Sequence, residues 1–150
     1  MKRIALLGLV CFALSGCGDD KVISDEMFAG DWKCEIIEYK STWDKSSFGE
    51  FKPTTEKQIK LLSFKYENNS LYLKDSEKED WKASSLIEKY NNKTTQKEEV
   101  FFIDKITKSL KKISNNKFIT TYESEIIVKD EKYKSLNKKL KREVICTRLK

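Results

Sequence analysis

The chain has 150 residues and a formal net charge of +6, from 30 Lys and Arg against 24 Asp and Glu, and it contains no histidine. This length accommodates one domain, and the lack of histidine excludes Ser-His-Asp triads, imidazole bases and histidine-ligated zinc. One proline and five glycines exclude collagen-like and proline-rich classes, and an aromatic content of 11% argues against a disordered chain.

The N-terminal segment has the layout of an export signal. Lys2 and Arg3 precede an apolar run over residues 4–14, which is shorter than the roughly 18–20 residues that span a bilayer. The run ends in Leu-Ser-Gly-Cys at residues 14–17, which resembles the lipobox of bacterial lipoprotein signal peptides. The resemblance implies cleavage after residue 16 and lipidation of Cys17. The alternatives are an ordinary cleaved signal peptide with Cys17 free, and a short retained anchor.

Lipidation would leave residues 17–27 as a tether and residues 28–150 as one folded domain. In enteric lipoproteins an aspartate directly after the lipidated cysteine implies retention in the inner membrane, whereas this chain has Gly18 there. We therefore expect attachment to the bacterial cell envelope, with the outer membrane favoured over the inner one. Removing Lys2 and Arg3 leaves 28 basic against 24 acidic residues, and this mild excess is too small for a nucleic-acid-binding surface.

Two cysteines remain for the mature domain once Cys11 leaves with the signal peptide and Cys17 carries the lipid. An exported domain reaches an oxidising compartment, so Cys34 and Cys146 are predicted to form a disulfide. The bridge would close a loop of about 112 residues and contribute about 4.7 kcal/mol in the loop-entropy model. The alternative is two buried free cysteines. A metal or redox role would need closer spacing or more ligands.

The mature domain opens with a strand pattern. Trp32, Cys34 and Ile36 alternate with Lys33 and Glu35, which is the period of a half-buried strand. Further runs rich in β-branched and aromatic residues predict strands over residues 59–66, 71–73, 100–103, 118–122, 125–129 and 143–149. Helical spacing within residues 81–90, 103–113 and 133–140 offers one or two short helices as alternatives.

Asparagine supplies the turn chemistry, because the chain beyond the tether has only Gly30, Gly49 and Pro53. Asn-Asn pairs occur at residues 68–69, 91–92 and 115–116, and the first and third are placed as hairpin turns. The pattern predicts a mainly β fold, an antiparallel meander with one or two short helices.

Gly30-Asp31-Trp32 resembles the Gly-x-Trp motif that opens lipocalins and related calycin-like barrels. The resemblance implies that an arginine from the last strand packs over Trp32, for which Arg142 and Arg148 are the candidates. A bridge between Cys34 and Cys146 would then join the first strand to the last, as a small closed up-and-down barrel requires. The alternative is an open β-sheet with packed helices.

Acidic residues are frequent but scattered. Glu77, Glu79 and Asp80, and separately Asp130 and Glu131, suit solvated loops better than paired catalytic carboxylates. No calcium loop, phosphate-binding loop or nucleophile elbow is present in the sequence. We therefore predict a protein that is not an enzyme and has no catalytic residue, metal site or cofactor.

The sequence favours a membrane-anchored interaction module that binds an envelope protein partner. Such binding would serve exclusion, immunity, inhibition or scaffolding. Its expected contact surface combines the aromatic loop at residues 43–51 with a basic strand end. The residues concerned are Trp43, Phe48, Phe51, Lys138, Lys139, Lys141 and Arg142. The alternative is a lipocalin-like carrier of a small apolar ligand, in which these aromatic side chains would face inward. An ordinary core position is the third reading of the three aromatic residues.

Overall fold

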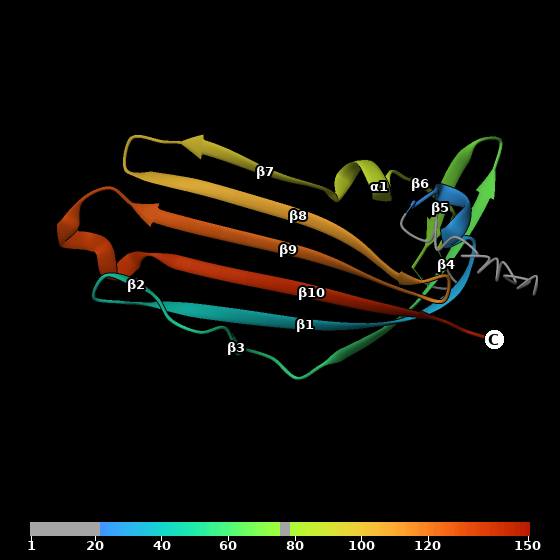
Figure 1. Cartoon of the computed structure of the whole chain (residues 1–150), viewed down its shortest axis with the longest axis horizontal. Coiled ribbons are helices and arrows are strands. Elements are labelled where there is room, and N and C mark those ends of the chain that lie inside the picture. Colours follow the sequence, from blue (N-terminus) through green and yellow to red (C-terminus); the bar gives the residue numbers. More distant parts are fainter. Residues whose placement is uncertain (1–21, 76–78) are drawn as a thin grey trace, which may run out of the picture.

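The structure is a computed structural model that describes residues 22–75 and 79–150 (Figure 1). The predicted signal peptide, Cys17, Gly18 and Glu77 lie outside these residues. The strands are β1 (Gly30–Asp44), β2 (Ser47–Phe48), β3 (Lys52–Pro53), β4 (Gln58–Glu67), β5 (Ser70–Lys74), β6 (Lys82–Ser84), β7 (Asn91–Glu98), β8 (Phe102–Ser114), β9 (Lys117–Val128) and β10 (Lys138–Arg148). The helices are the 3-10 turns η1 (Asp25–Phe28) and η2 (Glu131–Leu136) and the single α-helical turn α1 (Leu86–Lys89).

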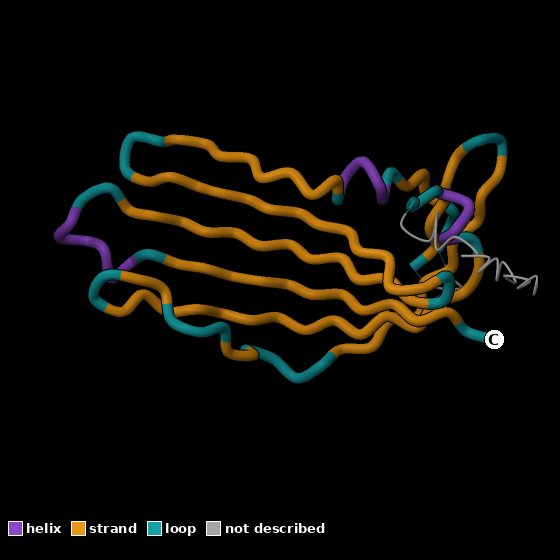
Figure 2. Tube along the Cα trace, in the orientation of Figure 1, coloured by secondary structure: helices purple, strands orange, loops and turns teal. Residues whose placement is uncertain are grey.

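The strands form one antiparallel sheet that is curled into a half-barrel (Figure 2), so the mainly β prediction is confirmed. The order is β6-β5-β4-β1-β10-β9-β8-β7, with β2 and β3 paired to β1. The first long strand therefore lies beside the last, as in an up-and-down barrel. The sheet is open between β6 and β7, which are the two ends of this order. Of the two arrangements that the sequence left open, a closed barrel and an open sheet, the half-barrel has the strand order of the first without its closure.

The core fills the end of the half-barrel that carries η1 and the C-terminus, here called the proximal end (Figure 1). Phe118 packs edge-on against Phe28 and Trp32, with ring centroids 5.0 and 4.8 Å apart. Leu71, Phe64 and Leu110 complete the buried apolar layer. Ile23 and Met27 also pack against this core, so the packed region extends into the segment that we expected to be a tether.

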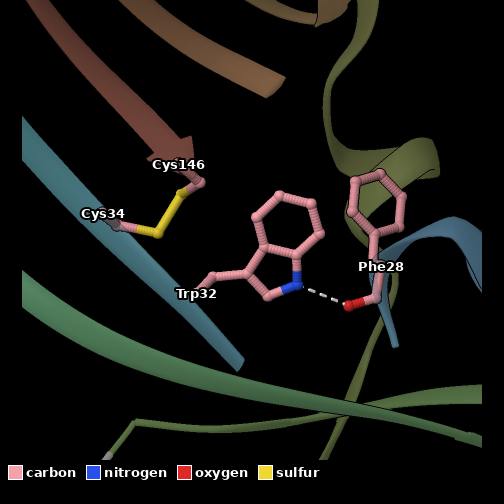
Figure 3. The surroundings of a disulfide bond; sticks show 4 residues. All are labelled: Phe28, Trp32, Cys34 and Cys146. Atoms are coloured by element: carbon pink, nitrogen blue, oxygen red, sulfur yellow. Dashed lines mark hydrogen bonds between the residues drawn. A yellow bond between two sulfur atoms is a disulfide. The ribbon is translucent and has the colours of Figure 1, made fainter. Parts of the chain in front are cut away.

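The predicted disulfide between Cys34 and Cys146 is present (Figure 3). The two residues face each other across the pairing of β1 with β10, and both side chains are buried. The bridge thus fastens the first strand to the last, next to Trp32.

An arginine packs over Trp32, as the Gly-x-Trp resemblance implies, and it is Arg148. Its guanidinium carbon lies 4.4 Å from the indole centroid, and its Nη2 donates to the carbonyl of Met27 at 2.6 Å. Its Nη1 donates to the carbonyl of Ala29. The indole N–H in turn donates to the carbonyl of Phe28 at 2.7 Å (Figure 3). Arg148 therefore joins η1 to the last strand.

Arg142, the second candidate for this role, lies six residues earlier on β10, opposite Glu38. Its Nε is 3.8 Å from a Glu38 carboxylate oxygen, and its side chain is half-exposed. The expectation that it packs over Trp32 is wrong, since β10 is extended and six residues separate the two arginines by roughly 20 Å.

Both asparagine pairs that were predicted as hairpin turns form them. Asn68 and Asn69 have φ angles of 51° and 57° and connect β4 to β5, as a tight hairpin requires. Asn115 and Asn116 connect β8 to β9. The middle pair begins β7 instead, where the Asn92 side chain accepts a hydrogen bond from the Leu110 N–H at 3.2 Å.

The helical alternatives resolve mostly into strand. Residues 103–113 lie in β8, and residues 133–140 divide between η2 and β10. Only the segment from 81 to 90 contains an α-helical turn, α1. No helix within residues 22–75 and 79–150 is both long and apolar enough to cross a bilayer.

Gly30 is expected to tolerate no side chain. Its φ is +126°, and a Cβ there would stand 2.5 Å from Nη1 of Arg148. Gly30→Ala should lower the free energy of unfolding by about 2 kcal/mol, since the strained backbone and the displaced arginine both oppose it. Urea denaturation followed by tryptophan fluorescence measures the change. Gly49→Ala is the matched control, because its nearest atom would be 3.7 Å away; an equal loss in both variants would contradict the role of Gly30.

Candidate partner-binding surface

The aromatic loop is a tight hairpin at the end of β1. Trp43 pairs with Phe48, and their rings meet edge-on with centroids 5.0 Å apart. The turn needs a left-handed residue, and Lys45 supplies it with a φ of 50°. Ser41 Oγ donates to the carbonyl of Gly49 at 2.6 Å, and this hydrogen bond connects β1 to the residue that follows β2. The two aromatic side chains are therefore held in a fixed arrangement.

Two lysines of β10 lie over the aromatic rings of this region. Lys139 Nζ is 6.0 Å from the Phe48 centroid and 5.6 Å from that of Phe51. Lys141 Nζ is 5.2 Å from the Phe51 centroid and 4.4 Å from that of Tyr39. These distances suit cation–π contacts. The structure thus brings the predicted loop and part of the predicted basic strand into one surface.

We call this surface the aromatic–lysine cluster. It consists of Tyr39, Trp43, Phe48, Phe51, Lys139 and Lys141. Tyr39 was not among the predicted residues. Its period-two spacing from Trp43 places both on the same face of β1, and this spacing is the signal that identifies it.

Lys138 and Arg142, which the sequence places in the same surface, lie on the other face of the sheet. Successive side chains of a strand point to opposite sides, so residues 138 and 142 share the side of the buried Cys146. Arg142 faces Glu38 there. The structure therefore divides the predicted basic strand end between the two faces of the half-barrel.

Carboxylates balance the charge of the cluster. Lys139 Nζ lies 3.3 Å from Glu125 and 3.8 Å from Glu123, and Lys141 Nζ lies 3.8 Å from Glu143. All five side chains are only about a quarter to a third exposed. The lysines are therefore held between these carboxylates and the aromatic rings, and Trp43, Phe48 and Phe51 are half-buried beside them.

The hairpin of β1 and β2 lies at the end of the half-barrel opposite to η1, which we call the distal end (Figure 1). A further apolar surface lies at this end. Val100 and Phe101 form the turn between β7 and β8 and are 78% and 76% exposed. The backbone N–H of Lys129 donates to the carbonyl of Phe101 at 3.0 Å and holds the turn against β9. The distal tip consists of Val100, Phe101, Phe102, Tyr133 and Leu136.

The sequence did not identify the distal tip as a turn. The sequence pattern predicts a strand over residues 100–103, and the turn has no glycine, proline or asparagine to mark it. Ion pairs flank it instead, between Lys97 and Glu99 and between Lys129 and Glu98. The hydrogen bond and positive charge of Lys129 hold the pKa of Glu98 below its usual range.

The inner face of the half-barrel forms an open trough of about 560 Å³. Apolar side chains from four of its strands line part of it, namely Ile36, Leu62, Leu73 and Val144. Lys60 and Arg142 lie at its margin. Trp43, Phe48 and Phe51 do not line this trough and are not members of the buried core. Their position therefore differs from that expected for a carrier or for an ordinary core.

Three of the acidic residues that the sequence singles out have structural partners, namely Glu79, Asp130 and Glu131. Asp130 accepts a hydrogen bond from the Lys132 N–H at 2.9 Å at the start of η2. Glu79 pairs with Lys82 at 2.8 Å, and this hydrogen bond raises the pKa of the Lys82 ammonium. Residues 22–75 and 79–150 contain no group of three or more Cys, Asp or Glu side chains placed to hold a metal.

The chain matches no family model, no curated protein and no solved structure. Function is therefore inferred from two properties of the described residues. One is the chemistry of the aromatic–lysine cluster. The other is its place at the distal end, while the described chain enters the half-barrel through η1 at the proximal end (Figure 1).

Proposed function

We propose that this chain is a lipid-anchored protein of the bacterial envelope, preferentially of the outer membrane, that binds another envelope protein and does not catalyse a reaction. The observation that carries the proposal is the aromatic–lysine cluster. Trp and Tyr are among the residues that contribute most to protein–protein binding energy, because they bury large areas with little loss of conformational entropy, and Trp43 and Tyr39 place one of each in this cluster. Binding of this kind serves exclusion, immunity, inhibition or scaffolding.

Anchoring strengthens such a contact. A tether confines the domain to the membrane surface and raises its effective concentration toward a partner in the same envelope. An intrinsic affinity in the micromolar range, about −8 kcal/mol, then suffices for occupancy. The distal position of the cluster supports this arrangement, since it directs the cluster away from the end at which the chain would be anchored.

The open trough favours a second candidate function, the carriage of a small apolar ligand. Its volume of about 560 Å³ is within the usual range of small-molecule sites. Carriers usually enclose most of the ligand surface, whereas this sheet remains open between β6 and β7. We therefore place partner binding first.

The cluster is tested by Trp43→Ala combined with Phe48→Ala. Aromatic hot-spot residues contribute at least about 2 kcal/mol each, so the double variant, which loses about 4 kcal/mol, should bind its partner roughly 1,000-fold more weakly. A photoreactive amino acid at the exposed Ser47 would capture the partner in intact cells, and the adduct should disappear in the double variant. Tyr72→Ala, an aromatic change at the proximal end, should retain it. Full capture and cellular function in the double variant would place the contact elsewhere.

Anchoring is tested by Cys17→Ser. The change removes the only sulfur at the predicted cleavage site, so labelling by a fatty-acid analogue should be lost completely and the precursor should accumulate. Cys11→Ser is the matched control, because it removes a cysteine of the signal peptide and should leave labelling intact. Normal maturation and membrane fractionation of the Cys17→Ser protein would contradict the lipid anchor.

A further inference from the structure

A second exposed apolar surface lies on the outer face at the proximal end. It consists of Ile59, Leu61, Trp81 and Leu149, whose side chains are 55%, 61%, 39% and 44% exposed. All four line one open groove of about 830 Å³. We call this surface the proximal patch.

The patch exists because β4 is apolar on both of its faces. Leu62 and Phe64 point inward to the core and the trough, whereas Ile59 and Leu61 alternate with them and point outward. Leu149 is held beside them because its N–H donates to the carbonyl of Asp31 at 2.8 Å. A strand of an antiparallel sheet that faces only water normally has a polar outer face, so this composition indicates that the outer face is covered.

Lysines bracket the tryptophan of the patch. Lys65 Nζ lies 5.2 Å and Lys74 Nζ lies 5.9 Å from the Trp81 ring centroid. Lys65 also pairs with Glu67 at 3.0 Å, and two carboxylates that line the groove are paired with other lysines, Asp75 with Lys60 and Glu79 with Lys82. Tryptophan with flanking lysines is the typical composition at a membrane–water interface, where the ring lies at headgroup level and lysine stems extend toward anionic phosphates.

The short connection to the proposed lipid places this end of the molecule at the bilayer. Cys17 and Val22, the first described residue, are five residues apart, so fully extended chain separates them by at most about 18 Å. Ile23 already packs on the core, and η1 packs against β4 and β5. The strand that carries Ile59 and Leu61 is thus among those nearest to the anchor.

We infer that the proximal patch rests on the headgroup region of the bilayer to which the chain is anchored, an inference that depends on the proposed lipidation of Cys17. Three exposed aliphatic side chains and Trp81 enter the interface, and Lys65 and Lys74 meet anionic headgroups. The half-barrel is thereby held at a defined orientation on the membrane, with its aromatic–lysine cluster at the end away from the anchor.

The experiment uses the lipidated protein in vesicles of phosphatidylethanolamine and phosphatidylglycerol with brominated acyl chains. Trp43→Phe serves as the parent, because Trp32 is fully buried and Trp81 is then the exposed tryptophan. Bromine should quench the Trp81 emission in the parent. Adding Ile59→Asp and Leu61→Asp should abolish most of this quenching, although flotation with the vesicles persists through the lipid. The matched control, Val100→Asp with Phe101→Asp at the distal tip, should be quenched like the parent.

Four other results would contradict the contact between the proximal patch and the bilayer. A parent that floats with the vesicles but shows no quenching overturns the membrane contact and leaves lipidation standing. A protein that carries no lipid at Cys17 overturns both. Equal loss of quenching in the distal control shows that the loss is not specific to the patch. A dimer in detergent that Ile59→Asp and Leu61→Asp dissociate would make a second copy the occupant instead of the bilayer.

Discussion

Replacing Cys34 and Cys146 together by alanine is expected to lower the free energy of unfolding by about 4.7 kcal/mol. The bridge closes a loop of 112 residues, and its loss releases that loop in the unfolded chain. Both cysteines are essentially inaccessible to solvent, so the substitutions also remove packed sulfur next to Trp32. The midpoint of urea denaturation, followed by tryptophan fluorescence, measures the effect.

The size of this effect follows from the topology. The first half of the sheet, β1 to β6, and the second half, β7 to β10, meet along the pairing of β1 with β10, since β6 and β7 are not paired. The disulfide lies in that seam, near its proximal end. Without it, the connection depends on the hydrogen bonds and side-chain contacts of the seam.

Reduction of the native protein should reproduce the shift caused by the double alanine variant, which controls for the packing change. Mass spectrometry of non-reduced tryptic peptides should find the two cysteines joined. Free, alkylatable thiols in the protein isolated from cells, or an unchanged urea midpoint after reduction, would show that the bridge does not stabilise the chain as expected.

Much of the fold is predictable because local patterns and long-range constraints agree. The alternation of Trp32, Cys34 and Ile36 marks the inner face of β1, and the buried disulfide fixes which strand lies beside it. Asn68 and Asn69 supply the left-handed residues of a tight hairpin. Each of these features is decided by a few neighbouring residues or by one covalent bond.

The helical spacing within residues 103–113 was misleading for a physical reason. Ile106 and Leu110 lie on the inner face of β8 and Ile103 on its outer face, as their pairing with β9 shows. Ile113 lies at the irregularity between Lys112 and Ser114. Apolar residues taken from two faces of one strand can thus imitate one face of a helix, and single-sequence periodicity does not separate the two.

The candidate surface was only partly predictable for a similar reason. Strand alternation is sufficient to separate Lys139 and Lys141 from Lys138 and Arg142, because the latter pair shares its face with Cys146. The sequence analysis places all four residues in one surface because they are close together in the sequence. The exposed turn at Val100 and Phe101 depends instead on where β8 begins, and the backbone contacts to Lys129 and Glu99 that decide this lie outside any local motif.

Arg148→Ala is expected to cost about 3 kcal/mol of the free energy of unfolding. Two charged hydrogen bonds, to the carbonyls of Met27 and Ala29, are lost, and the indole of Trp32 loses its cation. Arg148→Lys should restore less than half of the loss, because an ammonium cannot reach both carbonyls and stack on the ring as a planar guanidinium does.

The urea midpoint measures stability, and hydrogen exchange at the Ala29 amide measures whether η1 remains closed, since that amide donates to the carbonyl of Glu26. Arg142→Ala is the matched control: its side chain is half-exposed, and its contact with Glu38 is long, so it should change stability by only about 0.5 kcal/mol or less. If both arginine variants lost the same amount, the two carbonyls beneath Arg148 would not be what fastens η1 to the last strand. If only Arg148→Ala causes a large loss of stability and faster exchange at Ala29, then the Arg148 side chain is what connects η1 to the last strand.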